Sequence, residues 1–108
     1  MNSLAQSWYK LNILEQMGNI GSEINRALNW QKKGNADYKH RALDRALELF
    51  DLTLADPRWA KISGRLKEVA RARELSCDFF WGENQYNETG ESLMKYFDEF
   101  ALAARKDR

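Results

Sequence analysis

Four carboxylates of this chain have the residue types and helical spacing of a magnesium site. Glu48 and Asp51 are three residues apart, and Glu74 and Asp78 are four residues apart. Each pair therefore lies on one face of a helix. Carboxylate oxygens are ligands that Mg²⁺ accepts. If the two helices are antiparallel neighbours, the pairs meet, and the sequence predicts a Mg²⁺ site as one alternative.

The same four residues are similar to the acidic pairs of the all-α nucleoside triphosphate pyrophosphohydrolases of the MazG type. The second pair contains one residue more than the family's spacing. The resemblance implies Mg²⁺-dependent hydrolysis of a nucleoside triphosphate.

The remaining reactive side chains form no catalytic set. His40, the only histidine, is predicted on a polar helical face, and Cys77 is predicted to be a buried thiol without a paired histidine. Arg73 falls within an apolar helical stripe. A buried arginine needs a carboxylate partner, for which Glu23 and Glu48 are the candidates. We therefore expect a structural ion pair at Arg73, with a catalytic arginine as the less favoured alternative, and we assign no catalytic residue.

Charge is distributed unevenly along the second half of the chain. From Arg58 to Arg73 six residues are basic and one is acidic, whereas from Glu74 to Glu99 seven are acidic and one is basic. Arg58, Lys61 and Arg65 share one side of a predicted helix. This pattern favours a solvated face with acids nearby, and its alternative is a contact to phosphate or RNA.

Length and composition predict one compact domain over residues 1–108. The chain is 44% hydrophobic, which is sufficient for a core, and its net charge of +1 implies no bulk attraction to nucleic acid or membrane. One cysteine excludes an intramolecular disulfide. Because we find no leader and no apolar run long enough to span a bilayer, we expect a cytoplasmic protein.

Caps and stops divide the chain into four predicted helices, over residues 4–32, 35–55, 57–81 and 91–105. The residues that mark these ends are Ser3 with Gln6, Gly34, Asn35, Asp56 with Pro57, Gly82 and Thr89. The helix over 35–55 is apolar around more than half of its circumference, so we expect it to pack against several neighbours. The sequence predicts an all-α, antiparallel (up-down) four-helix bundle.

The first predicted helix contains Gly18 and Gly21, and each glycine costs about 1 kcal/mol relative to alanine in a helix. The helix side opposite the core carries large apolar residues followed by small ones: Leu4, Trp8, Leu11, Gly18 and Ser22. An apolar patch beside small residues favours a close helix–helix contact, so we expect a homodimer with this side at its interface. The alternative is a break near the two glycines, with the first segment folded back on its own bundle.

Residues 12–56, and above all the stretch NIGSEINRALNWQKKGNADYKHRALDRALELFDLTLAD, resemble the first helical hairpin of HEPN-type small all-helical proteins. Both have a long helix, a short polar turn with a tyrosine and an alanine-rich helix. The resemblance implies a dimer that works beside a minimal nucleotidyltransferase, in a toxin–antitoxin or nucleotide-handling system. Ribonuclease members carry an arginine shortly before a histidine, but Lys33, Gly34 and Asn35 precede His40 here. The resemblance therefore implies a non-catalytic member.

We predict a non-enzymatic interaction protein without a cofactor, which binds a nucleotidyltransferase-like or toxin–antitoxin-type protein. One alternative is a Mg²⁺-dependent nucleoside triphosphate pyrophosphohydrolase that uses the four carboxylates. A second alternative is an RNA-binding protein that uses Arg58, Lys61 and Arg65. Whether the four carboxylates converge distinguishes the first alternative from our prediction.

Overall fold

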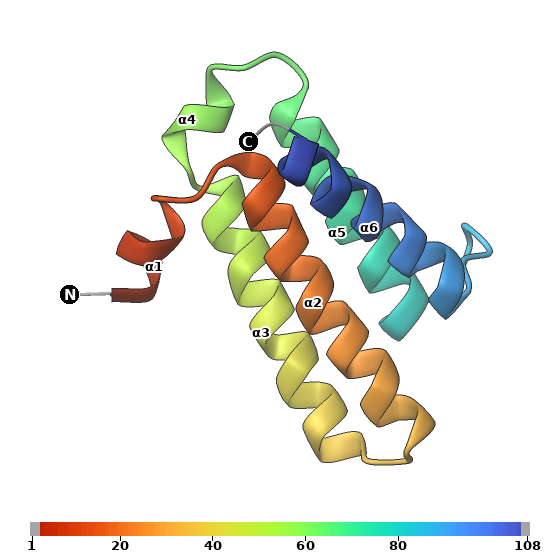
Figure 1. The fold of residues 1–108 in the computed structure, drawn as a ribbon. Helices are drawn as coiled ribbons and strands as arrows, with labels where there is room; N and C mark the ends of the chain where they lie inside the picture. The colour runs from red at the N-terminus through yellow and green to blue at the C-terminus, as the bar shows by residue number, and fades with distance from the viewer. Residues whose placement is uncertain (1–2, 107–108) are drawn as a thin grey trace.

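The computed structural model describes residues 3–106, which form six α-helices and contain no strand (Figure 1). In chain order the helices are α1 (Ser3–Trp8), α2 (Ile13–Lys32), α3 (Ala36–Leu54), α4 (Pro57–Ala60), α5 (Arg65–Trp81) and α6 (Gly90–Lys106). Side chains are described for residues 4–100 and for residue 102, so the predicted cap at Ser3 lies outside them. The predicted all-α class is confirmed.

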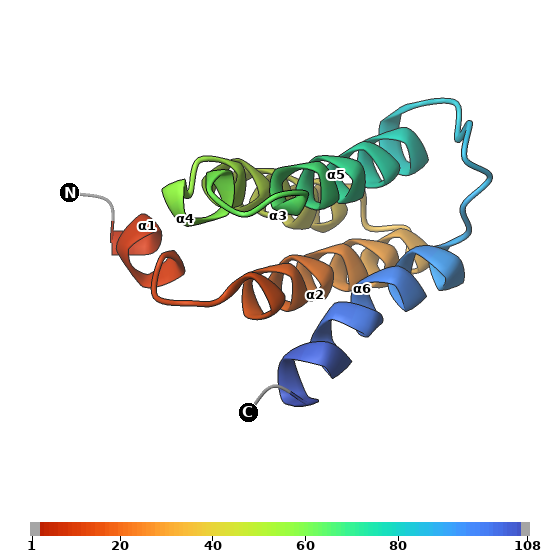
Figure 2. The ribbon, with the colours of Figure 1, turned by 90° about the horizontal axis from the view of Figure 1, so that it is seen from above.

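Helices α2 and α3 form a central hairpin, and the other long helices flank it. Helix α6 packs along α2, and α5 packs along α3 (Figure 2). The short helices α1 and α4 lie at the end of the hairpin that is opposite the α2–α3 turn (Figure 1). Because α3 contacts α2, α5 and α1, the expectation that it has several neighbours is confirmed.

Local capping explains most of the helix ends, as the sequence predicts. The Asn35 side chain accepts a hydrogen bond from the Tyr38 backbone N–H at 3.0 Å, after a left-handed Gly34 (φ +74°). Asp56 caps α4 in the same way, and Pro57 occupies the first turn. The Thr89 hydroxyl accepts from the Ser92 N–H at 3.0 Å at the start of α6. Each cap satisfies a backbone donor that the helix leaves free.

The prediction of one continuous helix over residues 4–32 is wrong. The alternative is confirmed in that the first segment packs on its own bundle, but it is wrong in placing the break at the glycines. The chain leaves helical geometry at residues 9–12, while Gly18 and Gly21 lie inside α2. Asn12 starts α2 with a capping box. Its side chain accepts from the Glu15 N–H at 2.7 Å, and its own N–H donates to the Glu15 carboxylate at 3.2 Å. This reciprocal pair starts a new helix at Ile13.

The predicted helix over residues 57–81 is also divided. Helix α4 ends at Ala60, and α5 begins at Arg65 after a turn. Gly64 caps α5 with φ +85°, a left-handed conformation that glycine adopts without steric cost. The turn changes the chain direction between α4 and α5, so residues on either side of it do not share one helical face.

Gly21 permits a close approach between α2 and α6 of the same chain. A Cβ atom at this position would lie 2.7 Å from the Cβ atom of Phe97. Phe97 is 1% exposed and lies near Phe50, with ring centroids 6.4 Å apart. The absence of a side chain at Gly21 therefore lets α6 lie against α2 and places Phe97 in the core.

The core consists of apolar side chains from all six helices. Its fully buried large members are Met17, Ile20, Ile24, Leu43, Phe50, Val69, Leu93 and Phe97. Most of them come from α2 and α3, which accounts for the central position of the hairpin. Within the described residues, no helix has both the length and the apolar character required to cross a bilayer.

Candidate functional site

The four carboxylates predicted as an alternative Mg²⁺ site do not converge as metal ligands. Glu48 pairs with Arg45 at 3.3 Å, and Asp51 lies 3.6 Å from Arg73. No group of three or more His, Cys, Asp or Glu residues in the described part of the chain is arranged to hold a metal ion. Asp51, Glu74 and Asp78 line one groove between α3 and α5, but the described residues do not arrange them as a metal site, and the pyrophosphohydrolase alternative stays a prediction.

Glu74 and Asp78 hold the loop between α5 and α6. Glu74 accepts a hydrogen bond from the Tyr86 hydroxyl at 2.8 Å, which raises the pKa of Tyr86. Asp78 accepts from the backbone N–H groups of Gln85 and Tyr86, at 2.9 and 3.1 Å. Both carboxylates therefore have a structural explanation.

The predicted buried ion pair of Arg73 with Glu23 or Glu48 is wrong. The Arg73 side chain is 39% exposed, and its carboxylate neighbour is Asp51. Glu23 pairs instead with Arg26 at 2.9 Å, within α2. The stripe on α5 predicted an apolar environment for Arg73, but α3 leaves this edge of α5 open to solvent.

Cys77 lies in the groove between α3 and α5 that Arg73 also lines. It is half-buried, whereas the sequence predicts a buried thiol. Burial raises the pKa of the Cys77 thiol, and Asp51 adds to this rise while Arg73 opposes it. Cys77 is therefore a protonated thiol near neutral pH, and a thiol is a poor nucleophile. His40 is exposed on α3.

Arg58, Lys61 and Arg65 do not form the single basic face predicted as the alternative RNA contact. Arg58 belongs to α4, Lys61 follows that helix, and Arg65 begins α5. Arg65 pairs with Glu68 at 3.3 Å. Arg58 is bound by Asp56, so its guanidinium has a structural partner.

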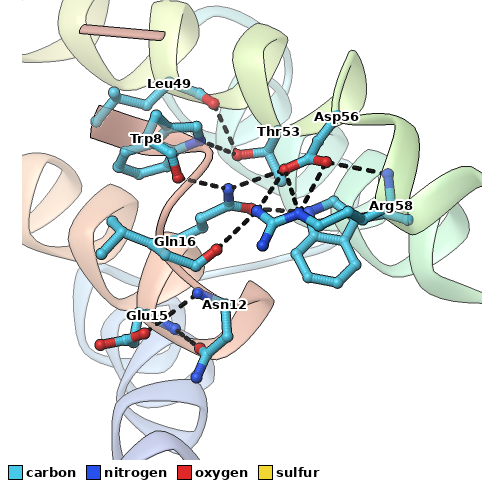
Figure 3. Close-up of polar contacts among 10 residues, drawn as sticks. Trp8, Asn12, Glu15, Gln16, Leu49, Thr53, Asp56 and Arg58 are labelled. Carbon is cyan, nitrogen blue, oxygen red and sulfur yellow. Dashed lines mark hydrogen bonds and ion pairs between the residues drawn. The ribbon is translucent and has the colours of Figure 1, made fainter. Parts of the chain in front are cut away.

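A buried polar cluster that no motif in the sequence predicts joins α1 and α4 to the central hairpin (Figure 3). Gln16 is 0% exposed and is its centre. Its amide donates to the Trp8 carbonyl at 3.0 Å and to the Asp56 carboxylate at 3.3 Å, and its oxygen accepts from the Trp59 indole at 2.8 Å. The Trp8 indole donates to the Thr53 hydroxyl at 2.9 Å.

Asp56 and Arg58 complete this cluster (Figure 3). The Arg58 guanidinium donates to the Asp56 carboxylate at 2.6 Å and to the Leu11 carbonyl at 2.7 Å, and it lies 4.4 Å from the Trp59 ring. Burial alone would raise the pKa of Asp56, but hydrogen bonds from Arg58 and Gln16 and the Arg58 charge outweigh it and lower the pKa. Because these groups satisfy one another, we assign the cluster to structure rather than to ligand binding.

An aromatic and arginine-rich groove lies between α2 and α3, near the turn of the hairpin. Its volume is about 490 Å³, and the residues that line it are Glu23, Arg26, Trp30, Tyr38, Arg41, Ala42 and Arg45. The Trp30 and Tyr38 rings are 4.8 Å apart at 52°, and Tyr38 is 43% exposed. We call the five members Arg26, Trp30, Tyr38, Arg41 and Arg45 the hairpin surface.

The helical spacing of the sequence contains the signal for the hairpin surface, although no catalytic or metal-binding motif includes these residues. Arg26 and Trp30 are four residues apart on one helix, and Tyr38, Arg41 and Arg45 follow at spacings of three and four on the next. Each set therefore lies on one helical face. Only the packing of α2 on α3 brings the two faces together.

The structure also places the five residues predicted at a dimer interface. Trp8 is 4% exposed because its own chain encloses it, so Leu4, Trp8 and Leu11 do not form the expected exposed apolar patch. Leu4 and Leu11 are half-buried against the core. Ser22 is exposed and Gly18 is half-buried, one turn apart on α2. The homodimer itself stays a prediction.

Comparison with known proteins finds no family model, curated protein or solved structure that matches this chain. The resemblances to the HEPN-type and MazG-type families therefore gain no support from these comparisons and stay expectations.

Proposed function

We propose that this chain is a non-enzymatic, cytoplasmic interaction protein that binds a protein partner through the hairpin surface. The observation that carries the proposal is the grouping of the half-buried Trp30 and the exposed Tyr38 with three arginines in one groove. Tryptophan, tyrosine and arginine are the residue types that most often dominate the binding energy of protein interfaces. These side chains combine a large apolar area with hydrogen-bond donors that can find acceptors at an interface.

The partner that we propose is a nucleotidyltransferase-like or toxin–antitoxin-type protein. This part of the proposal comes from the resemblance of residues 12–56 to the HEPN-type hairpin. We further infer that α2, α3, α5 and α6 serve as an antiparallel four-helix bundle that keeps the hairpin surface rigid, and that the chain forms a homodimer.

Coexpression with the proteins encoded beside this chain tests the proposal. We expect one of them to elute with the chain as a stable complex in size-exclusion chromatography. The double variant Trp30→Ala, Tyr38→Ala should weaken the complex at least about tenfold, because hot-spot truncation costs about 2 kcal/mol or more.

Tyr86→Ala is the matched control, since Tyr86 is a comparably exposed tyrosine (41%) outside the groove. It should leave the complex unchanged. Absence of any complex, or equal effects of the double variant and Tyr86→Ala, would contradict the proposed function.

A further inference from the structure

Two cations near the α2–α3 turn, Lys33 and Arg41, lie over the rings of Trp30 and Tyr38. The Lys33 ammonium is 5.0 Å from the centre of the Trp30 ring, and the Arg41 guanidinium is 5.1 Å from the centre of the Tyr38 ring. Stacking on an aromatic ring holds a guanidinium in place without using its N–H donors. Arg41 is therefore positioned by Tyr38 with its donors still available.

Arg41 differs in this respect from the other two arginines of the hairpin surface. Arg26 is paired with Glu23 at 2.9 Å, and Arg45 is paired with Glu48 at 3.3 Å. Among the residues that the structure describes, the Arg41 side chain makes no hydrogen bond or ion pair, and its guanidinium lies over the Tyr38 ring. Among the described residues, the groove thus contains two arginines with a carboxylate partner, Arg26 and Arg45, and one without such a partner, Arg41.

We propose that the hairpin surface binds an acidic segment of a protein partner. A carboxylate of that segment forms a two-pronged hydrogen bond with the Arg41 guanidinium, and an adjacent apolar side chain packs on Trp30 and Tyr38. A guanidinium and a carboxylate match in this geometry because both are planar and fork-shaped. The inference rests on the proposed function and specifies the chemistry of the partner.

The charges around the groove favour an acidic protein segment over a nucleic acid. A phosphodiester backbone carries one negative charge per nucleotide and needs several free cations along its path. Here Glu23 lines the groove itself, and Glu48 neutralises Arg45 at its edge. Two cations without an acidic partner among the described residues, Arg41 and Lys33, lie beside the two rings, and this set fits a carboxylate next to an apolar anchor.

Titration with short synthetic peptides, followed by the amide NMR signals of the protein, tests the inference. One peptide carries a phenylalanine between aspartates and glutamates, and its matched partner has every acid replaced by asparagine or glutamine. We expect the acidic peptide to shift signals of residues 23–45 and the neutral peptide to bind at least about tenfold more weakly. A charge-assisted bidentate contact has an energy of that order.

Arg41→Gln should reduce the affinity for the acidic peptide about tenfold, because it removes the positively charged guanidinium and retains only a neutral amide. The control is Arg71→Gln, because Arg71 also lies over a tyrosine ring, that of Tyr86 at 5.9 Å, but outside the groove. Arg71→Gln should leave binding unchanged. Circular dichroism of both variants shows whether they keep the helical fold.

Three outcomes would overturn the inference: equal binding of the two peptides, equal effects of Arg41→Gln and Arg71→Gln, or tighter binding of a single-stranded oligouridylate than of the acidic peptide. The same variants in the coexpressed complex separate this inference from the proposed function. If the Trp30 and Tyr38 substitutions weaken the complex but Arg41→Gln does not, the proposed function is supported and the acidic segment is rejected. If the complex depends on none of Trp30, Tyr38 and Arg41, both the proposed function and the acidic segment are rejected.

Discussion

Gln16 is the residue on which the position of α1 depends most directly. It contributes three hydrogen bonds, to the Trp8 carbonyl, the Asp56 carboxylate and the Trp59 indole, at a site with no exposed surface. Such a side chain contributes little net energy while its bonds are made, but its removal leaves several buried groups without partners. Gln16 therefore makes one arrangement of α1, α2 and α4 much more stable than the alternatives.

Replacing Gln16 by leucine should destabilise the fold by about 3 kcal/mol or more, because each buried polar group left unsatisfied costs about 1–3 kcal/mol. Urea unfolding measures this change in the free energy of unfolding. The control is Asn19→Ala on the exposed side of the same helix, which should change stability by no more than about 0.5 kcal/mol. Similar effects of the two substitutions would show that the cluster does not fasten the helices.

Asp56 makes stability depend on pH in the acid range. Its pKa in the folded state is below that of an ordinary aspartate, about 3.9. The folded state therefore gains stability from the carboxylate above the unfolded pKa and loses it as the pH falls through the folded pKa.

Asp56→Asn removes this contribution while keeping a side chain that can cap α4. We expect the variant to be less stable by about 1–3 kcal/mol at neutral pH, since a buried charge-assisted contact is lost. The difference should shrink as the pH falls below about 4. Urea unfolding of both proteins across pH measures it, and a difference that stays constant down to strong acid would contradict the role of the Asp56 charge.

At the scale of the helices, Gly21 determines how closely α6 approaches α2. Gly21→Ala places a Cβ atom 2.7 Å from the Phe97 Cβ atom, so α6 must shift. Overpacking of this kind costs about 1–3 kcal/mol, which exceeds the gain of about 1 kcal/mol in helix propensity. We expect a lower melting temperature, measured by circular dichroism. Ser22→Ala, its exposed neighbour, should have almost no effect, and a rise in melting temperature for Gly21→Ala would contradict this packing.

Helix ends that depend on local chemistry can be predicted from the sequence, whereas apolar periodicity does not predict the breaks at residues 9–12 and 61–64. Asn35, Asp56 with Pro57, and Gly82 mark ends that the structure confirms within a residue or two. The capping box from Asn12 to Glu15 was equally visible, but the apolar periodicity through Trp8 and Leu11 made the helix look continuous. Apolar periodicity predicts which side chains share a face only within one continuous helix. Because the chain breaks at residues 9–12, α1 takes a new direction, and Trp8 lies in the core and not on the predicted dimer surface.

The candidate sites were less predictable because they depend on contacts between helices. Arg73 has Asp51 as its neighbour rather than Glu23 or Glu48, and this choice follows from the register of α5 on α3. The hairpin surface likewise exists only where α2 brings Trp30 beside Tyr38 of α3. A single sequence supplies the faces of helices but not the register in which they meet.

At the scale of the whole molecule, the predicted homodimer now rests on a smaller surface than the sequence indicated. Trp8 is enclosed by its own chain, while Gly18 and Ser22 keep a small-residue face on the side of α2 that solvent reaches. A two-fold contact between copies of this face would bring two α2 helices close together, because neither residue holds a facing helix away.

Gly18→Leu should therefore weaken the dimer and leave each chain helical, since a large side chain separates the facing helices. Analytical ultracentrifugation of the unmodified protein over a range of micromolar concentrations decides whether the dimer exists, and circular dichroism of the variant reports its helix content. The control is Asn29→Leu, an exposed position farther along α2 that should not change the association. If the unmodified protein sediments as a monomer at every concentration, no second copy packs against Gly18, and the homodimer prediction is wrong.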